Sequence, residues 1–304
     1  MNIDSANIEP YRRYHDFHEN INITIKVISA SVFNLINHLS ASDEKELGRL
    51  IEQTDKSWTL PPIWSLEGKI SEEYFGIVSD LGILSIFSAL DDFINGVEAE
   101  ISRWNANPYC KKQLLIVDKY EIQDEKIRNL FSKYGWDIGE IEEESRIIKY
   151  FQLCRNCMAH RSSKASEALM EFSLSEELKD SFEKFKNETI NLLPTFEVGQ
   201  KIFIDPKTAI FCSHLVREAT KIVNQKVISY LGIEGIVNMA VFHFIFKDVP
   251  VNITACKTPE AVINLILSER YRVYLENGTE AIQILKSIDK WIPCIKMFQK
   301  KYGK

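Results

Sequence analysis

Long stretches of helical period dominate this sequence and constrain what it can fold into. The 304 residues include only 12 glycines and 9 prolines, which cluster at breaks between periodic segments. Over residues 10–39, apolar side chains such as Phe17, Ile21, Ile25 and Ile28 recur at steps of three and four. That spacing puts them on one face of a helix. The sequence therefore predicts a mainly helical protein.

Similar patterns predict further helices. They cover residues 42–54, 71–104, 124–134, 138–160, 175–193, 208–231, 259–267 and 280–298. Gly135 is placed to cap the helix before it, and Ser175 to cap the helix after it. Two short stretches differ: 198–204 around Gly199 favours a short strand or hairpin, and 270–275 (RYRVYL) favours a strand.

The order of these elements indicates an all-α fold with a minor β element. We expect three parts: a helical N-terminal extension over 1–65, a central helical bundle over 66–231, and a mixed, mainly helical C-terminal extension over 232–304. The break at Leu60-Pro61-Pro62 lies near the first boundary.

Composition narrows the functional classes. The formal net charge is -6, so any contact with nucleic acid has to come from a local basic patch. The sequence contains no Walker A loop, dinucleotide-binding glycine motif or GxSxG elbow, which argues against the enzyme classes that use them. Its first residues are polar, and no apolar run reaches the roughly 18 residues of a membrane span. We expect a cytoplasmic protein that does not enter the membrane.

Metal or cofactor sites are not evident. Among six cysteines, only Cys154 and Cys157 form a CxxC pair, and no second pair completes a zinc site. Both fall in a helical pattern that favours packing in the core. His15 and His18 lack a third ligand, so we interpret them as surface residues. We expect no metal and no other cofactor.

One segment, Ile147 to Arg161, combines residues that can carry chemistry. On a helix, its core face consists of Ile147, Ile148, Phe151, Cys154 and Met158. Arg155 lies at the edge of that face, whereas Asn156 and His160 are four residues apart and stack on another. Arg155 and His160 diverge by about 140° on a straight helix. They converge only if the helix ends or bends near His160, or if two chains meet across a dimer axis.

The chemistry available to this segment is phosphodiester transfer. His160 could give or take a proton, and Arg155 could hold phosphate oxygens. Asn156 could hold the phosphate or orient His160. Together they could let a ribose 2′-hydroxyl attack its own phosphate without a metal. The surrounding cations expected to bind RNA are Lys149, Arg161 and Lys164.

The Arg–His spacing alone is a weak signal. Arg13 and His18 repeat it, but they lack the asparagine and open a helix rather than close one. Singly, Arg155 is equally typical of an arginine at the rim of a core, and His160 of a histidine at a helix end. Asn156 and the helical setting favour a functional site over these structural interpretations. Asp91 and Asp92 are typical of a solvated helix face, although one could turn inward and fix Arg155.

Arg155, Asn156 and His160 match the RNxxxH form of the motif of HEPN domains. The resemblance covers about residues 70–231, including a long helix before the motif helix and another after it. It implies an HEPN-like helical bundle that forms a homodimer with the two motifs facing each other. A subgroup that carries tyrosine two positions after the histidine is disfavoured, because Ser162 stands there.

Many HEPN members are metal-independent endoribonucleases of toxin–antitoxin and phage-defence systems. The resemblance therefore implies an RNA-cleaving enzyme, with an antitoxin or regulatory protein as a further partner. Other members have lost activity and serve as scaffolds that bind RNA or protein. A third interpretation is a purely structural helical protein in which the motif is accidental.

Overall fold

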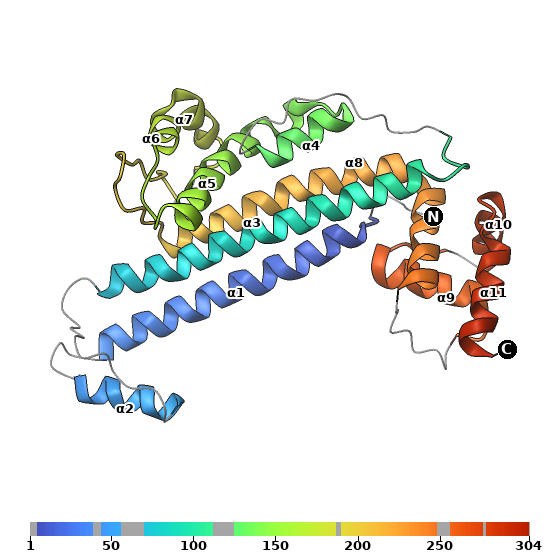
Figure 1. Ribbon diagram of the computed structural model, residues 1–304, viewed down its shortest axis with the longest axis horizontal. Coiled ribbons are helices and arrows are strands. Elements are labelled where there is room, and N and C mark those ends of the chain that lie inside the picture. The colour runs from blue at the N-terminus through green and yellow to red at the C-terminus, as the bar shows by residue number, and fades with distance from the viewer. Residues whose placement is uncertain are drawn as a thin grey trace. The chain divides into compact units, whose positions relative to one another are not determined.

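The computed structural model describes residues 5–38, 44–55, 70–111, 125–186, 190–247, 256–275 and 278–303. Helix makes up 78% of this part, which holds no strand and so confirms the all-α class. The elements, shown in Figure 1, are α1 (Glu9–His38), α2 (Glu44–Thr54), α3 (Ile70–Asn105), α4 (Lys126–Tyr134), η1 (Ile138–Ile141), α5 (Glu142–His160), α6 (Glu167–Leu174), α7 (Glu176–Glu183), α8 (Pro206–Phe246), α9 (Pro259–Ile266), η2 (Leu267–Tyr271), α10 (Gly278–Ser287) and α11 (Trp291–Tyr302).

The chain divides into two compact units, each built from segments that are distant in sequence. Unit 1 comprises Met1–Phe17, Ala89–Ser145 and Arg217–Lys304. Unit 2 comprises His18–Ser88 and Arg146–Val216. The division expected at residues 65 and 231 stays a prediction, and the Leu60–Pro62 break lies outside the described residues.

Unit 2 has a core built from α3, α5 and the first turns of α8. Phe87 and Phe151 are fully buried, and the ring of Phe211 lies edge-on to that of Phe182, with centroids 5.9 Å apart. The face expected on the motif helix is buried as the period predicts. Its members are Ile147, Ile148, Phe151, Cys154 and Met158. Burial of this stripe fixes which way the remaining side chains of α5 point.

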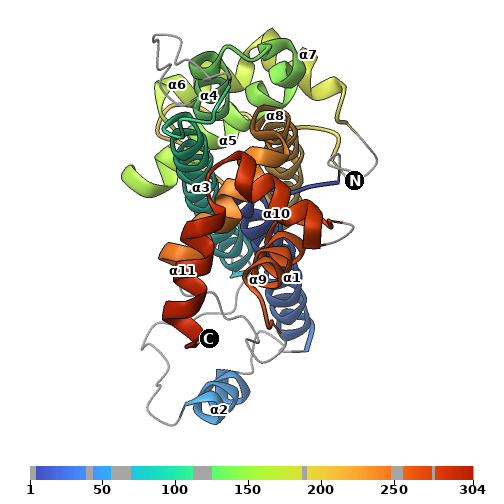
Figure 2. The same ribbon diagram turned by 90° about the vertical axis from the view of Figure 1, so that its right-hand side faces the viewer.

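Unit 1 packs the second part of α3 with α4 and the C-terminal helices. Leu90 and Val97 of α3 are fully buried. Helices α9, α10 and α11 contact one another, and Figure 2 shows them together on the side facing the viewer. Their apolar residues Ile263, Leu285 and Cys294 close this part of the core. The C-terminal segment is thus an integral part of a folded unit.

Several expected helix ends are confirmed. Gly135 adopts a left-handed conformation (φ 65°), and its N–H bonds the last carbonyls of α4. Ser175 caps α7, its hydroxyl accepting from the Leu178 N–H at 3.3 Å. Gly232 (φ 57°) interrupts α8 where the sequence predicts an end, but the helix resumes and runs to Phe246. The helix expected over 175–193 ends early, at Glu183.

The strand expected over 198–204 is wrong. These residues form an isolated bridge between Lys164 and Lys201 and a few backbone hydrogen bonds with the turn after α5, but no strand. Gly199 turns the backbone with a φ of 80°, and Pro206 already begins α8. The segment joins a turn to a helix, and its hydrogen bonds go to the turn after α5 instead of to a neighbouring strand.

The strand expected over 270–275 is also wrong. The chain continues from α9 through a π-helical turn, and Arg272 then reverses it with a φ of 53°. Tyr271 is fully buried, and the Val273 N–H bonds the Leu267 carbonyl at 3.1 Å. Burial of the Tyr271 ring in the core thus overrides the local β preference of RYRVYL.

The cysteines of the described residues are free thiols, and Cys154 and Cys157 are both buried. Burial raises the pKa of Cys154 well above its usual range, and the Cys157 thiol lies 3.5 Å from the Ser166 hydroxyl. Both side chains of this CxxC pair thus lie in the core, as the helical pattern predicts.

Helix α8 is long and apolar enough to cross a membrane by length and composition. Within its most apolar window, 61% is buried in the molecule. The core helix of a soluble protein meets the same criteria, so this finding does not assign the helix to a membrane.

A close approach of two helices gives the first testable prediction. A Cβ added at Gly96 of α3 would lie 2.7 Å from Cγ of Pro10 in α1, whose ring cannot move aside by rotation. We expect Gly96→Ala to lower the free energy of unfolding by about 1–3 kcal/mol. Gly76→Ala on the same helix meets only Phe203 at 3.4 Å and should raise it by up to about 1 kcal/mol.

Urea denaturation of both variants measures these values. Equal effects of the two substitutions would contradict this packing.

Candidate functional site

The motif helix ends near His160, where the sequence pattern predicts its end. His160 is the last residue of α5, and Ser162 and Ser163 both take left-handed conformations (φ 52° and 58°). The N–H groups of Arg161 and Ser163 bond the Cys157 carbonyl at 2.9 and 3.2 Å. This turn stops the helix, so the expected end near His160 is confirmed.

Arg155 and Asn156 contact each other at the rim of the core. Arg155 Nη1 donates to Asn156 Oδ1 at 3.1 Å, and the same oxygen accepts from Gln152 Nε2 at 3.2 Å. Arg155 is half-buried, and its Nε has no hydrogen-bond partner among the described residues. Asn156 therefore touches the arginine, whereas the sequence suggested the phosphate or His160 as its partner.

His160 projects into solvent from the last turn of α5. In the part of the chain that the structure describes, its side chain forms no hydrogen bond or ion pair with Arg155 or any other residue. One chain thus brings Arg155 and Asn156 into contact and leaves His160 free to meet a ligand or a second copy.

The three cations expected to bind RNA differ in their surroundings. Arg161 and Lys164 are exposed just after the helix end. Lys149 instead places its ammonium over the ring of Phe172, 4.8 Å from the ring centre. Lys201, also exposed, lies beside Lys164 through the isolated bridge. Sequence reasoning missed Lys201 because no local pattern signals pairing between such distant turns.

An acid from α3 supports the turn that follows the motif. The Ser163 hydroxyl donates to Asp80 Oδ2 at 3.1 Å, and Asp80 Oδ1 has no hydrogen-bond partner within the described ranges. Burial raises the pKa of Asp80, although the Ser163 hydrogen bond and the charge of Lys201 oppose the rise. The sequence had suggested that Asp91 or Asp92 could turn inward and fix Arg155. Instead, Asp91 pairs with Lys126, and Asp92 pairs with Arg13 at 3.3 Å.

The raised pKa of Asp80 predicts a pH dependence of stability. Between the ordinary pKa of 3.8 and the raised pKa of the folded protein, Asp80 retains a proton that the unfolded chain has lost. Stability is therefore lost as the pH rises through this window, by at most about 1.4 kcal/mol per pH unit. Asp80→Asn keeps an acceptor for Ser163 and removes the titration. As the pH rises above the ordinary pKa of 3.8, its free energy of unfolding should fall less than that of the wild type.

Urea denaturation at several pH values tests this prediction, with Asp92→Asn as the exposed control. Parallel pH profiles of Asp80→Asn and the wild type would contradict it.

The second Arg–His pair has a structural role. Arg13 forms its ion pair with Asp92. The His18 side chain, interpreted from sequence as a surface group, is buried. Its Nδ1 lies 2.8 Å from the Ser213 hydroxyl, and its Nε2 lies 3.2 Å from Asn22 Nδ2. The surface interpretation of His18 is wrong because this face of α1 packs in the core.

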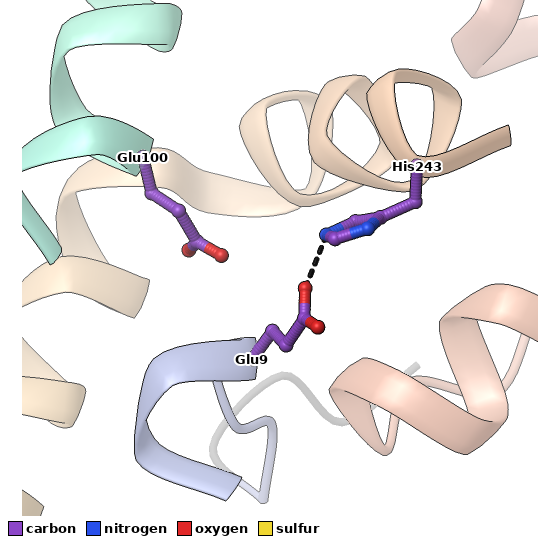
Figure 3. Close-up of side chains that lie close together, drawn as sticks. All are labelled: Glu9, Glu100 and His243. Carbon is purple, nitrogen blue, oxygen red and sulfur yellow. Dashed lines mark ion pairs between the residues drawn. The ribbon is translucent and has the colours of Figure 1, made fainter. Parts of the chain in front are cut away.

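A buried polar cluster in unit 1 forms a second candidate site. Glu9 of α1, Glu100 of α3 and His243 of α8 place their donor atoms within 4.8 Å of one another (Figure 3). His243 Nε2 pairs with Glu9 Oε2, and Arg270 Nη1 donates to Glu9 Oε1 at 2.5 Å. Sequence reasoning missed this cluster because its members are far apart in the chain and share no motif.

The pKa values of the two acids in this cluster are shifted in opposite directions. Burial raises the pKa of Glu100 to about 8, and the nearby carboxylate of Glu9 adds to the rise. Burial alone would also raise the pKa of Glu9. The hydrogen bond from His243 and the positive charge of Arg270 outweigh it and hold that pKa at about 2.

Comparisons with known proteins found no matching family model, no matching curated protein and no matching solved structure. Function therefore has to be argued from the residues themselves.

Proposed function

We propose that the chain is a metal-independent endoribonuclease whose active site contains Arg155, Asn156 and His160. The supporting observation is the local geometry at the end of α5. An arginine held by an asparagine lies at the rim of the core, and an exposed histidine closes the same helix. The last two turns of α5 thus carry both a phosphate-binding group and a proton-transfer group, and His160 is accessible to solvent.

His160 acts as the general acid or base. An imidazole can exchange protons near neutral pH, and His160 is exposed and free of ion pairs among the described residues. It can therefore reach the ribose 2′-hydroxyl or the leaving 5′-oxygen of an RNA strand. Positioned proton transfer of this kind contributes roughly 10²–10⁴-fold to a rate.

Arg155 stabilises the charge that develops on the phosphate. Its bond to Asn156 uses Nη1 and holds the guanidinium in one orientation, which leaves other N–H groups for phosphate oxygens. Electrostatic stabilisation is strongest when the donor is already in place before the reaction. Asn156 thus acts as a positioning residue for Arg155.

Arg161, Lys164 and Lys201 form the RNA-binding surface of this proposal. The three side chains are exposed and lie on two turns joined by backbone hydrogen bonds, including Ala165 N–H to the Gln200 carbonyl at 2.8 Å. They supply the local positive charge that the net charge of -6 lacks. Lys149, engaged with Phe172, is a weaker candidate for phosphate contact.

The resemblance to HEPN domains extends the proposal to a cytoplasmic homodimer of a toxin or anti-phage system. Two motifs that face each other would combine Arg155 of one copy with His160 of the other. An antitoxin or regulatory protein would then control the site. The alternative is a catalytically inactive scaffold that binds RNA or a protein partner. It is favoured by the lack of any Arg155–His160 contact among the described residues.

The proposal predicts RNA cleavage in the presence of EDTA. His160→Ala and Arg155→Ala should each reduce the cleavage rate by about 100-fold or more, because each removes a group that acts in the transition state. Gel analysis of a labelled RNA panel measures this rate, with circular dichroism confirming that each protein remains folded.

Matched controls are available in the same chain. Arg13→Ala alters the second Arg–His pair, and His214→Ala removes another exposed histidine; both should cleave like the wild type. A wild type that binds RNA but leaves the whole panel intact would support the scaffold instead. Cleavage by His160→Ala at the wild-type rate would exclude the proposed mechanism.

A further inference from the structure

The buried cluster of Glu9, Glu100 and His243 has the composition of a metal site. Three helices each contribute one ligand-type side chain (Figure 3), and their donor atoms lie within 4.8 Å of one another. Glu9 is 8% exposed, and Glu100 and His243 are each 2% exposed. Carboxylate oxygens with an imidazole nitrogen are a ligand set that Zn²⁺ accepts.

Outer donors orient both carboxylates toward the centre of the cluster. Arg270 Nη1 donates a hydrogen bond to Oε1 of Glu9 at 2.5 Å. The Tyr271 hydroxyl donates to Oε1 of Glu100 at 3.5 Å. Glu9 Oε2 and His243 Nε2 pair with each other, and Glu100 Oε2 has no hydrogen-bond partner among the described residues. Hydrogen bonds to the outer oxygen of a ligating carboxylate are typical of metal sites.

Glu100 carries the second, independent observation. Its Oε2 is buried and has no hydrogen-bond partner in the described part of the chain, and Figure 3 shows its carboxylate directed toward Glu9 and His243. Arg270 compensates the charge of Glu9, whereas Glu100 forms no ion pair with the described residues. A buried, unpaired carboxylate needs either a proton or a cation.

We propose that Glu9, Glu100 and His243 bind one divalent transition-metal cation of the Zn²⁺ class. Metal–ligand bonds of about 2.0–2.2 Å require only small side-chain movements from the present spacing. Binding displaces the proton between His243 Nε2 and Glu9 Oε2 and any proton on Glu100, because each ligand atom has to be deprotonated. The cation joins α1, α3 and α8 and stabilises the folded unit, with water as the fourth ligand that Zn²⁺ requires.

This site is separate from the proposed ribonuclease chemistry. Glu9, Glu100 and His243 belong to unit 1, whereas Arg155 and His160 belong to unit 2. The cation takes no part in cleavage, and neither proposal depends on the other.

Zinc titration of the full-length, tag-free protein tests the site after treatment with a chelator. Isothermal calorimetry with Zn²⁺ should give one site per chain, and the melting temperature should rise with zinc concentration because the folded state binds the ion. Glu100→Gln keeps the shape of the side chain but ligates poorly, so zinc affinity should fall by roughly 10- to 100-fold.

Glu98→Gln is the matched control, since Glu98 lies on the same helix but pairs with Lys133 at 2.6 Å; its zinc affinity should equal that of the wild type. His243→Gln is a second ligand variant with the same expected loss. Failure of the wild type to bind Zn²⁺ would overturn the site, as would wild-type affinity in Glu100→Gln.

Discussion

The turn that ends α5 determines what the candidate site can be. Two N–H groups close on the Cys157 carbonyl, and Ser162 and Ser163 then take left-handed conformations that cost roughly 1 kcal/mol or more each. This cost is offset by the backbone bonds from the following residues to the 199–202 segment and by the Ser163–Asp80 hydrogen bond. Because the helix stops here, His160 is exposed rather than covered by a further turn.

Much of the fold could be predicted because burial follows helical period closely in this chain. The apolar stripe of α5 is buried at every expected position, from Ile147 to Met158, and Gly135 caps α4 as its conformational freedom suggests. The errors occur where tertiary packing overrides local preference. RYRVYL has strand-forming residues, yet Arg270 and the buried Tyr271 end a π-helical turn, and Arg272 then reverses the chain.

Only those residues of the candidate site that are close together in sequence could be predicted. Arg155, Asn156 and His160 are neighbours in sequence, so a single helix was enough to suggest their relation. Asp80 and Lys201 reach the same region from distant segments, and no periodicity signals such contacts. The cluster of Glu9, Glu100 and His243 was invisible for the same reason, because only folding brings α1, α3 and α8 together.

The central claim is that Arg155 and His160 promote attack of a ribose 2′-hydroxyl on its own phosphate. The most direct test uses a cleaved oligoribonucleotide in which the nucleotide 5′ to the cut carries a single 2′-deoxy substitution. Mass spectrometry should detect 2′,3′-cyclic phosphate and 5′-hydroxyl ends from the RNA, and no cut at the deoxy position. Cleavage at the deoxy position, or products with 5′-phosphate ends, would contradict the account.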